Sequence, residues 1–83
     1  MSKTVSLALA ACDQDHLISH IVAPEHAGEW QVWLEDLGFV AGEHVKILKA
    51  HSWLGDPMVV RVGTSTYALK PAEAACIFVG FVG

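Results

Sequence analysis

The most regular pattern in the chain is a set of apolar residues spaced as on one face of an α-helix. Positions i, i+3, i+4 and i+7 of this set are occupied by Trp30, Trp33, Leu34 and Leu37. This spacing predicts a helix whose apolar face packs on a core. Gly38 follows the last apolar position, and we expect it to end the helix in a left-handed conformation.

The sequence defines the C-terminal end of this helix more closely than its N-terminal end. Gly28 weakens a first turn, so the helix is expected to begin anywhere from Pro24 to Gly28. At the other end, a Schellman motif would bring Phe39 back onto Leu34. Residues 40–42, Val-Ala-Gly, are expected to form a second tight turn before the next strand.

Short apolar or alternating segments separated by turn signals predict a mainly β domain. The expected strands are Val5–Leu9, Leu17–Val22, Glu43–Lys49, Met58–Val62, a segment ending at Tyr67–Leu69, and Cys76–Val82. Turns are expected at Cys12–Asp15, Gly55–Pro57 and Gly63–Ser65, and one helical turn at Pro71–Ala75. Five to six short antiparallel strands in 83 residues indicate a single small barrel or sandwich spanning 1–83.

Composition narrows the function classes. Hydrophobic residues make up 53% of the chain and charged residues 17%, so part of the apolar surplus is expected to form an exposed contact patch. The net charge is −4 and the five cations form no run, which disfavours nucleic-acid binding. Cys12 and Cys76 form no disulfide framework, and we expect them to be free buried thiols.

The N-terminal segment allows two interpretations. Leu9–Cys12 resembles a lipoprotein processing site behind a short apolar stretch, but such stretches are more often strands. No apolar run approaches the roughly 20 residues of a spanning helix, so we expect no membrane insertion.

The ordered pattern resembles the FeoA family. The resemblance rests on Trp33–Gly42, which reads as a helix ending in Leu-x-x-Leu-Gly followed by an apolar residue and a glycine before a strand, and continues through Val45–Ile47, Gly55–Pro57, Val59–Val62, Tyr67–Leu69 and Glu73–Val79. It implies an SH3-like barrel with one inserted helix and a short helical turn before the last strand. It also implies a cytosolic accessory protein that binds and modulates the FeoB membrane GTPase transporter. The same fold occurs in iron-dependent repressors.

Two positions depart from the family pattern. Residues 13–15, Asp-Gln-Asp, stand where the family often has glycine, and Lys70 stands where it often has arginine. Lysine cannot make the planar bidentate contact of arginine.

No nucleophile, base and orienting residue are recognisable together, and no glycine-rich phosphate loop occurs, so we do not expect an enzyme. Asp56 is explained by turn chemistry, with its side chain bonding its own backbone. A further hypothesis is that the protein regulates GTP hydrolysis by another protein. Arg61 is the one candidate for an arginine finger, and it lies within a strand pattern.

Five histidines in 83 residues raise the possibility of metal binding. His16 and His20 are expected to share one strand face, too far apart to chelate one ion. The candidate ligands for Zn²⁺ or Fe²⁺ are Cys12, Asp13, Asp15, His16, His20, His44 and His51. The simpler interpretation is that these histidines are solvated and that no cofactor is required. The alternative is a metal-responsive protein that dimerises through a metal bridge.

The predicted partner surface combines the edge of the helix with the loop before Met58. Tryptophan is the residue type most enriched at interface hot spots, and one helix on a small barrel cannot bury every apolar residue of its stripe. The candidate contact residues are Trp30, Trp33, Phe39, Trp53, Leu54 and Asp56.

Overall fold

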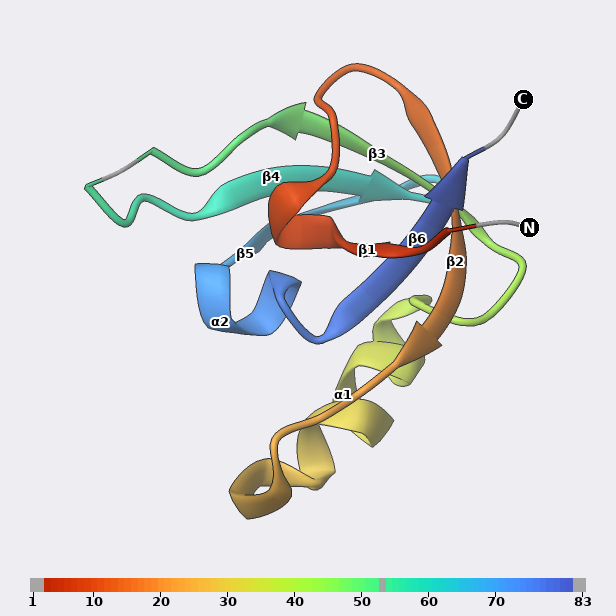
Figure 1. Ribbon diagram of the computed structural model, residues 1–83, viewed down its shortest axis with the longest axis vertical. Coiled ribbons are helices and arrows are strands. Elements are labelled where there is room, and N and C mark those ends of the chain that lie inside the picture. The colour runs from red at the N-terminus through yellow and green to blue at the C-terminus, as the bar shows by residue number, and fades with distance from the viewer. Residues whose placement is uncertain (1–2, 53, 82–83) are drawn as a thin grey trace.

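The computed structural model describes the backbone of residues 3–52 and 54–81 and forms one antiparallel sheet with strand order β1-β6-β2-β3-β4-β5. Figure 1 shows this sheet curling on itself, with α1 below it and α2 beside the start of β6. The strands are β1 Val5–Ser6, β2 Asp15–Ile21, β3 His44–Lys49, β4 Met58–Val62, β5 Ser65–Leu69 and β6 Ile77–Phe81. The helical elements are the 3₁₀ turns η1 Leu7–Leu9 and η2 Glu25–Ala27, and the α-helices α1 Glu29–Leu37 and α2 Pro71–Ala74. The mainly β prediction, with one inserted helix and a helical turn before the last strand, is confirmed.

The core lies inside the curved sheet and is built by period-two alternation. Val45 and Ile47 of β3 are buried opposite Val62 and Val60 of β4, while His44 points outward. The β6 residues Ile77 and Val79 are also fully buried, as predicted for an apolar final strand. Val82, the last residue predicted for that strand, lies outside the described residues.

Helix α1 follows the predicted pattern at its C-terminal end. Gly38 has φ 115°, its N–H donates to the Glu35 carbonyl, and the Phe39 N–H donates to the Leu34 carbonyl at 3.0 Å. These are the two hydrogen bonds of a Schellman motif. Leu34 and Phe39 are both fully buried, so this motif anchors the helix to the barrel.

The N-terminal strand is shorter than predicted. Only Val5 and Ser6 are extended, and the chain then turns at Leu7–Leu9, where the Ala10 N–H donates to the Leu7 carbonyl. Because this turn breaks the period of two, Leu7 is fully buried whereas Val5 and Leu9 are exposed. The prediction of a strand over Val5–Leu9 was therefore wrong for Leu7–Leu9.

Strand β2 contains a bulge that the sequence did not reveal. Ile18 is opposite Val79 and His20 is opposite Phe78, which leaves Ser19 as an extra residue. An extra residue moves the following side chains to the other face. His16 is therefore buried and His20 exposed, so the prediction that they share a face was wrong.

None of the helices formed by the described residues has both the length and the apolar character needed to cross a bilayer.

Candidate functional site

An open groove of about 520 Å³ lies between helix α1, the loop before β4 and the start of α2. Its lining residues come from three parts of the chain that are distant in sequence: Trp33, Gly55, Pro57, Ala68, Lys70, Pro71 and Glu73. We call this surface the Trp33 groove. It joins the helix edge to the loop, which are the two features predicted to bind a partner.

Helix α1 presents Trp33 to the Trp33 groove. Leu34 faces the core, while Trp30 and Leu37 are partly buried and pack on it. Trp33 lies at the margin of this apolar face and is 40% exposed. The predicted exposed edge of the helix is therefore at Trp33 and not at Trp30.

The opposite end of the groove is fixed by the cap of α2. The Lys70 N–H donates to Glu73 Oε1 at 2.8 Å, and the Glu73 N–H donates to the Lys70 carbonyl at 2.9 Å. Pro71 occupies a first-turn position, where a missing N–H costs nothing. This cap holds the Glu73 carboxylate in place, and a glutamate at the third helical position is the local sequence signal for it.

The loop before β4 is ordered by Ser52. Its hydroxyl donates to Asp56 Oδ2 at 3.0 Å and accepts from the Leu54 N–H at 3.2 Å. The turn is closed by the Gly55 N–H donating to the Ser52 carbonyl, so it lies earlier than the predicted Gly55–Pro57 turn. The Asp56 side chain bonds the Ser52 side chain rather than its own backbone, which corrects that prediction.

This loop carries Leu54, which is 70% exposed. Figure 1 shows that the hairpin of β3 and β4 projects from the body of the sheet. Trp53, another predicted contact residue of the loop, lies outside the described residues. Phe39 has no exposed surface and cannot touch a partner, because the Schellman motif places it in the core. The prediction of Phe39 as a contact residue was wrong.

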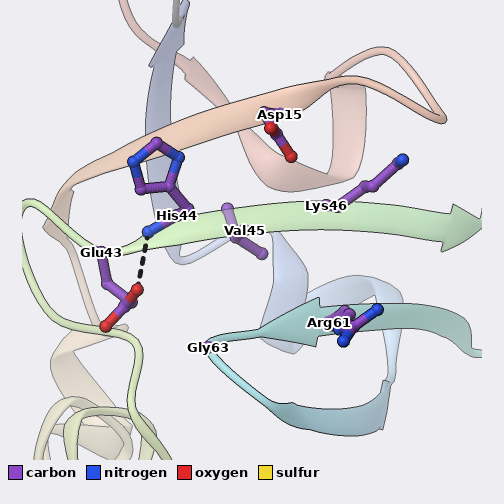
Figure 2. A pocket seen from close by; sticks show the side chains of 7 residues that line it. All are labelled: Asp15, Glu43, His44, Val45, Lys46, Arg61 and Gly63. Carbon is purple, nitrogen blue, oxygen red and sulfur yellow. Dashed lines mark hydrogen bonds between the residues drawn. The ribbon is translucent and has the colours of Figure 1, made fainter.

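A second depression, of about 350 Å³, lies on the outer face of β2, β3 and β4. Asp15, Lys46 and Arg61 are consecutive cross-strand neighbours along its floor, as Figure 2 shows. His44 lies beside them, and its N–H donates to Glu43 Oε1 at 3.0 Å. Two carboxylates and two cations thus line one surface, and no sequence motif reveals this arrangement because the residues are far apart in the chain.

The candidate metal ligands are spread over the surface and the core. Among the residues that the structure describes, no three His, Cys, Asp or Glu side chains are grouped closely enough to hold a metal ion. His16, expected to be solvated, is buried, and its Nε2 lies 2.8 Å from the Ala11 carbonyl. Asp13 sits in the turn before β2 with φ 60°, and Asp15 belongs to the outer-face depression instead.

The other histidines occupy separate places. His20 stacks on Phe78 with ring centroids 5.0 Å apart, and the Ser19 hydroxyl lies 2.9 Å from its Nδ1. His44 is exposed on the outer face of β3. His51 is half-buried, and its Nδ1 has no hydrogen-bond partner among the described residues.

The two cysteines are free, as predicted, but only one is buried. Cys12 is exposed, and its thiol donates to the Ile47 carbonyl. Cys76 is 4% exposed, and its thiol donates to the Ala72 carbonyl. Burial, and secondly the nearby Glu73 carboxylate, raise the pKa of the Cys76 thiol.

Several proteins of known structure have an architecture similar to that of this chain. FeoA of Stenotrophomonas maltophilia, solved in complex with zinc and described as a procaryotic SH3 domain protein, is 26% identical with a TM-score of 0.80, over 90% of this chain and 88% of that chain. A FeoA-like protein from Clostridium acetobutylicum is 26% identical with a TM-score of 0.77, over 95% of this chain and 87% of that chain. A manganese-dependent transcriptional repressor shares the fold with a TM-score of 0.83 at 13% identity, over 99% of this chain and 44% of that one. No curated protein matches the chain.

The strand order, the inserted helix and these similarities define a small SH3-like β-domain. The FeoA domain model matches residues 5–80, and the chain belongs to the FeoA domain family. The match begins earlier than the residues that carry the resemblance, Trp33 to Val79, and it includes β1 and Leu7, which are part of the same sheet and core.

Proposed function

We propose that this protein is a cytoplasmic accessory of bacterial ferrous-iron uptake that binds the cytosolic side of a FeoB-like membrane GTPase and modulates it. Family membership supports the transport context, and the similar protein from Stenotrophomonas maltophilia is described as a possible activating factor of ferrous iron transport. The observation that carries the binding role is the Trp33 groove, which places a partly exposed tryptophan in a concave surface with apolar and charged edges.

The groove has the chemistry of a protein contact. Trp33 and two prolines supply rigid apolar surface, and Lys70 with Glu73 supplies one charge of each sign at the rim. A tryptophan side chain offers about 150–250 Å², so the 40% still exposed on Trp33 is roughly 60–100 Å². Covering that area with a partner is worth about 1.5–2.5 kcal/mol, or roughly a tenfold to seventyfold change in affinity.

Binding to the cytosolic domain of a FeoB-like GTPase tests this proposal, with Trp33→Ala as the probe. Val32→Ala is the matched control, because Val32 is its helix neighbour and is 60% exposed but does not line the groove. We expect Trp33→Ala to weaken co-purification strongly and Val32→Ala to leave it unchanged. Equal retention of both variants would exclude the Trp33 groove as the contact surface.

Modulation of the GTPase is tested separately by its rate of GTP hydrolysis with and without this protein. Arg61 is exposed on the outer face of β4, in the depression of Figure 2, and is the candidate residue for a direct effect on hydrolysis. If the protein does not change the rate of GTP hydrolysis, a regulatory role is excluded and an adaptor role remains.

A metal-responsive role is a second candidate, favoured by the zinc complex of the similar protein from Stenotrophomonas maltophilia. In this chain His20 and His44 are exposed imidazoles among the candidate ligands, and a Zn²⁺ or Fe²⁺ ion shared between two copies would bind there. Sedimentation with excess ferrous iron or zinc tests this candidate, and an unchanged mass in both metals would exclude it.

A further inference from the structure

The two edges of the sheet differ in how they are protected from pairing with another chain. The β1 edge has only two residues and turns at once into η1. Strand β5 has five residues, pairs with β4 in one unbroken register, and contains neither a charged residue nor a proline. Natural sheets protect their edges by short strands, charges, proline or bulges, and β5 lacks the last three of these devices.

The tight turn before β5 determines which of its backbone groups point outward. The turn has two residues, Gly63 and Thr64, and a two-residue turn closes on a hydrogen-bonded pair, here Val62 and Ser65. Hydrogen-bonded pairs alternate along an antiparallel ladder. The second such pair therefore contains Tyr67, opposite Val60.

By the same alternation, the N–H and carbonyl groups of Thr66 and Ala68 point away from β4. Both residues are exposed, and no turn or loop hydrogen bond reaches either of them from the described residues. The β5 edge therefore offers two N–H groups and two carbonyls in line, which is the pattern that a further strand pairs with.

We propose that a second copy of this chain pairs with this edge, β5 against β5 and antiparallel, with the two-fold axis at Tyr67. In this register Thr66 stands opposite Ala68 of the second copy, and each such pair exchanges two hydrogen bonds. All four outward backbone groups of each copy are then satisfied. The contact is isologous, as expected for a two-fold dimer.

The neighbouring residues select this register over a shifted one. A shift towards Lys70 would need its backbone groups, but the Lys70 carbonyl already accepts from Glu73 and Ala74 and its N–H donates to the Glu73 carboxylate. With the axis at Tyr67, no like charges face each other, because β5 carries no charged residue and Lys70, which follows it, stands opposite the uncharged Thr64 of the second copy.

A second copy is favoured over an unrelated strand because the edge is complementary to itself. Its side chains on the outer face are small and uncharged, so the two copies meet without a repulsive pair. This pairing involves no metal, which distinguishes it from the bridged dimer considered above. The paired edge includes Ala68, which also lines the Trp33 groove, but the pairing is tested in the absence of the proposed partner of that groove.

The test is sedimentation velocity in EDTA from micromolar to millimolar protein, with Ala68→Pro as the probe. Proline removes the outward N–H without removing a β4–β5 hydrogen bond, and Ala68→Ser is the matched control that keeps this N–H. We expect the wild type and Ala68→Ser to shift from monomer to dimer with concentration and Ala68→Pro to stay monomeric. A wild type that is monomeric throughout, or an Ala68→Pro dimer of equal affinity, would overturn the proposal.

Amide hydrogen exchange of the unmodified protein gives an independent measurement if Ala68→Pro does not fold. Exchange at the Thr66 and Ala68 amides should slow as concentration rises, while exchange at Tyr67, already bonded to β4, should stay constant. Slowing at neither edge amide would overturn the proposal, as would a dimer that dissociates when EDTA is added.

Discussion

The same substitution, glycine to alanine, should have opposite effects at the two ends of helix α1. Gly38 has φ 115°, and an added Cβ would meet only the Val62 Cγ1 atom at 3.8 Å, an ordinary contact. The cost of Gly38→Ala therefore comes from the backbone, and a left-handed conformation costs a side-chain-bearing residue about 1–2 kcal/mol. Gly38→Ala should lower the unfolding midpoint by about 4–15 °C.

Gly28 provides the matched control. It lies between η2 and α1 with φ −57° and ψ −26°, so it is helical and not an extended capping residue. Nothing lies within 4 Å of an added Cβ. Gly28→Ala should therefore stabilise the protein by about 0.4–1 kcal/mol, chiefly by restricting the unfolded chain.

Urea denaturation of both variants, followed by circular dichroism, measures these changes in the free energy of unfolding. We expect the free energy of unfolding to fall for Gly38→Ala and to rise for Gly28→Ala. The dependence of this free energy on urea concentration should be the same for both variants as for the wild type. A Gly38→Ala variant as stable as the wild type would refute the Schellman ending of α1. A Gly28→Ala variant that is destabilised would show that η2 and α1 do not form one helical segment.

Three further substitutions test the core, one internal hydrogen bond and one titrating group. Leu7→Ala should cost about 2–5 kcal/mol in unfolding free energy and Leu9→Ala less than about 0.5, because only Leu7 is buried; equal effects would restore the longer first strand. Tyr67→Phe should cost about 0.5–1.5 kcal/mol, because the Tyr67 hydroxyl donates to the last carbonyl of α1 at 3.0 Å, and urea midpoints of the two proteins measure it. Because the pKa of Cys76 is raised on folding, its contribution to stability is complete below the ordinary thiol pKa and declines as pH rises through the raised value. Urea midpoints between neutral and alkaline pH should therefore fall more steeply for the wild type than for Cys76→Ala, and parallel curves would contradict this assignment.

Local signals predicted the elements of this fold well. The i, i+3, i+4, i+7 stripe with Gly38 gave the helix and its ending, because helix periodicity and left-handed capping depend on neighbouring residues alone. Val45 and Ile47 are two residues apart and lie on the buried face of β3, because side-chain alternation along a strand also depends on neighbouring residues alone. The bulge at Ser19 left no local signal, because it is defined by the register against β6.

The site was predicted only in part. Trp33 and the loop were identified, but exposure depends on where the helix lies on the barrel, and sequence could not separate Trp33 from Trp30. Phe39 was counted as a contact residue although the predicted Schellman motif packs it on Leu34, and its ring contact with Tyr67, distant in the chain, completes its burial. The outer-face depression joins Asp15, Lys46 and Arg61 through strand pairing, which no single segment reveals.

The central claim is that the Trp33 groove binds the cytosolic domain of a FeoB-like GTPase. Titration calorimetry of the two purified proteins, with the GTPase nucleotide-free and bound to GDP or a GTP analogue, measures it most directly. We predict saturable binding in at least one nucleotide state, weakened about tenfold or more by Trp33→Ala and unchanged by Val32→Ala. No binding of the wild-type protein in any nucleotide state would contradict the claim.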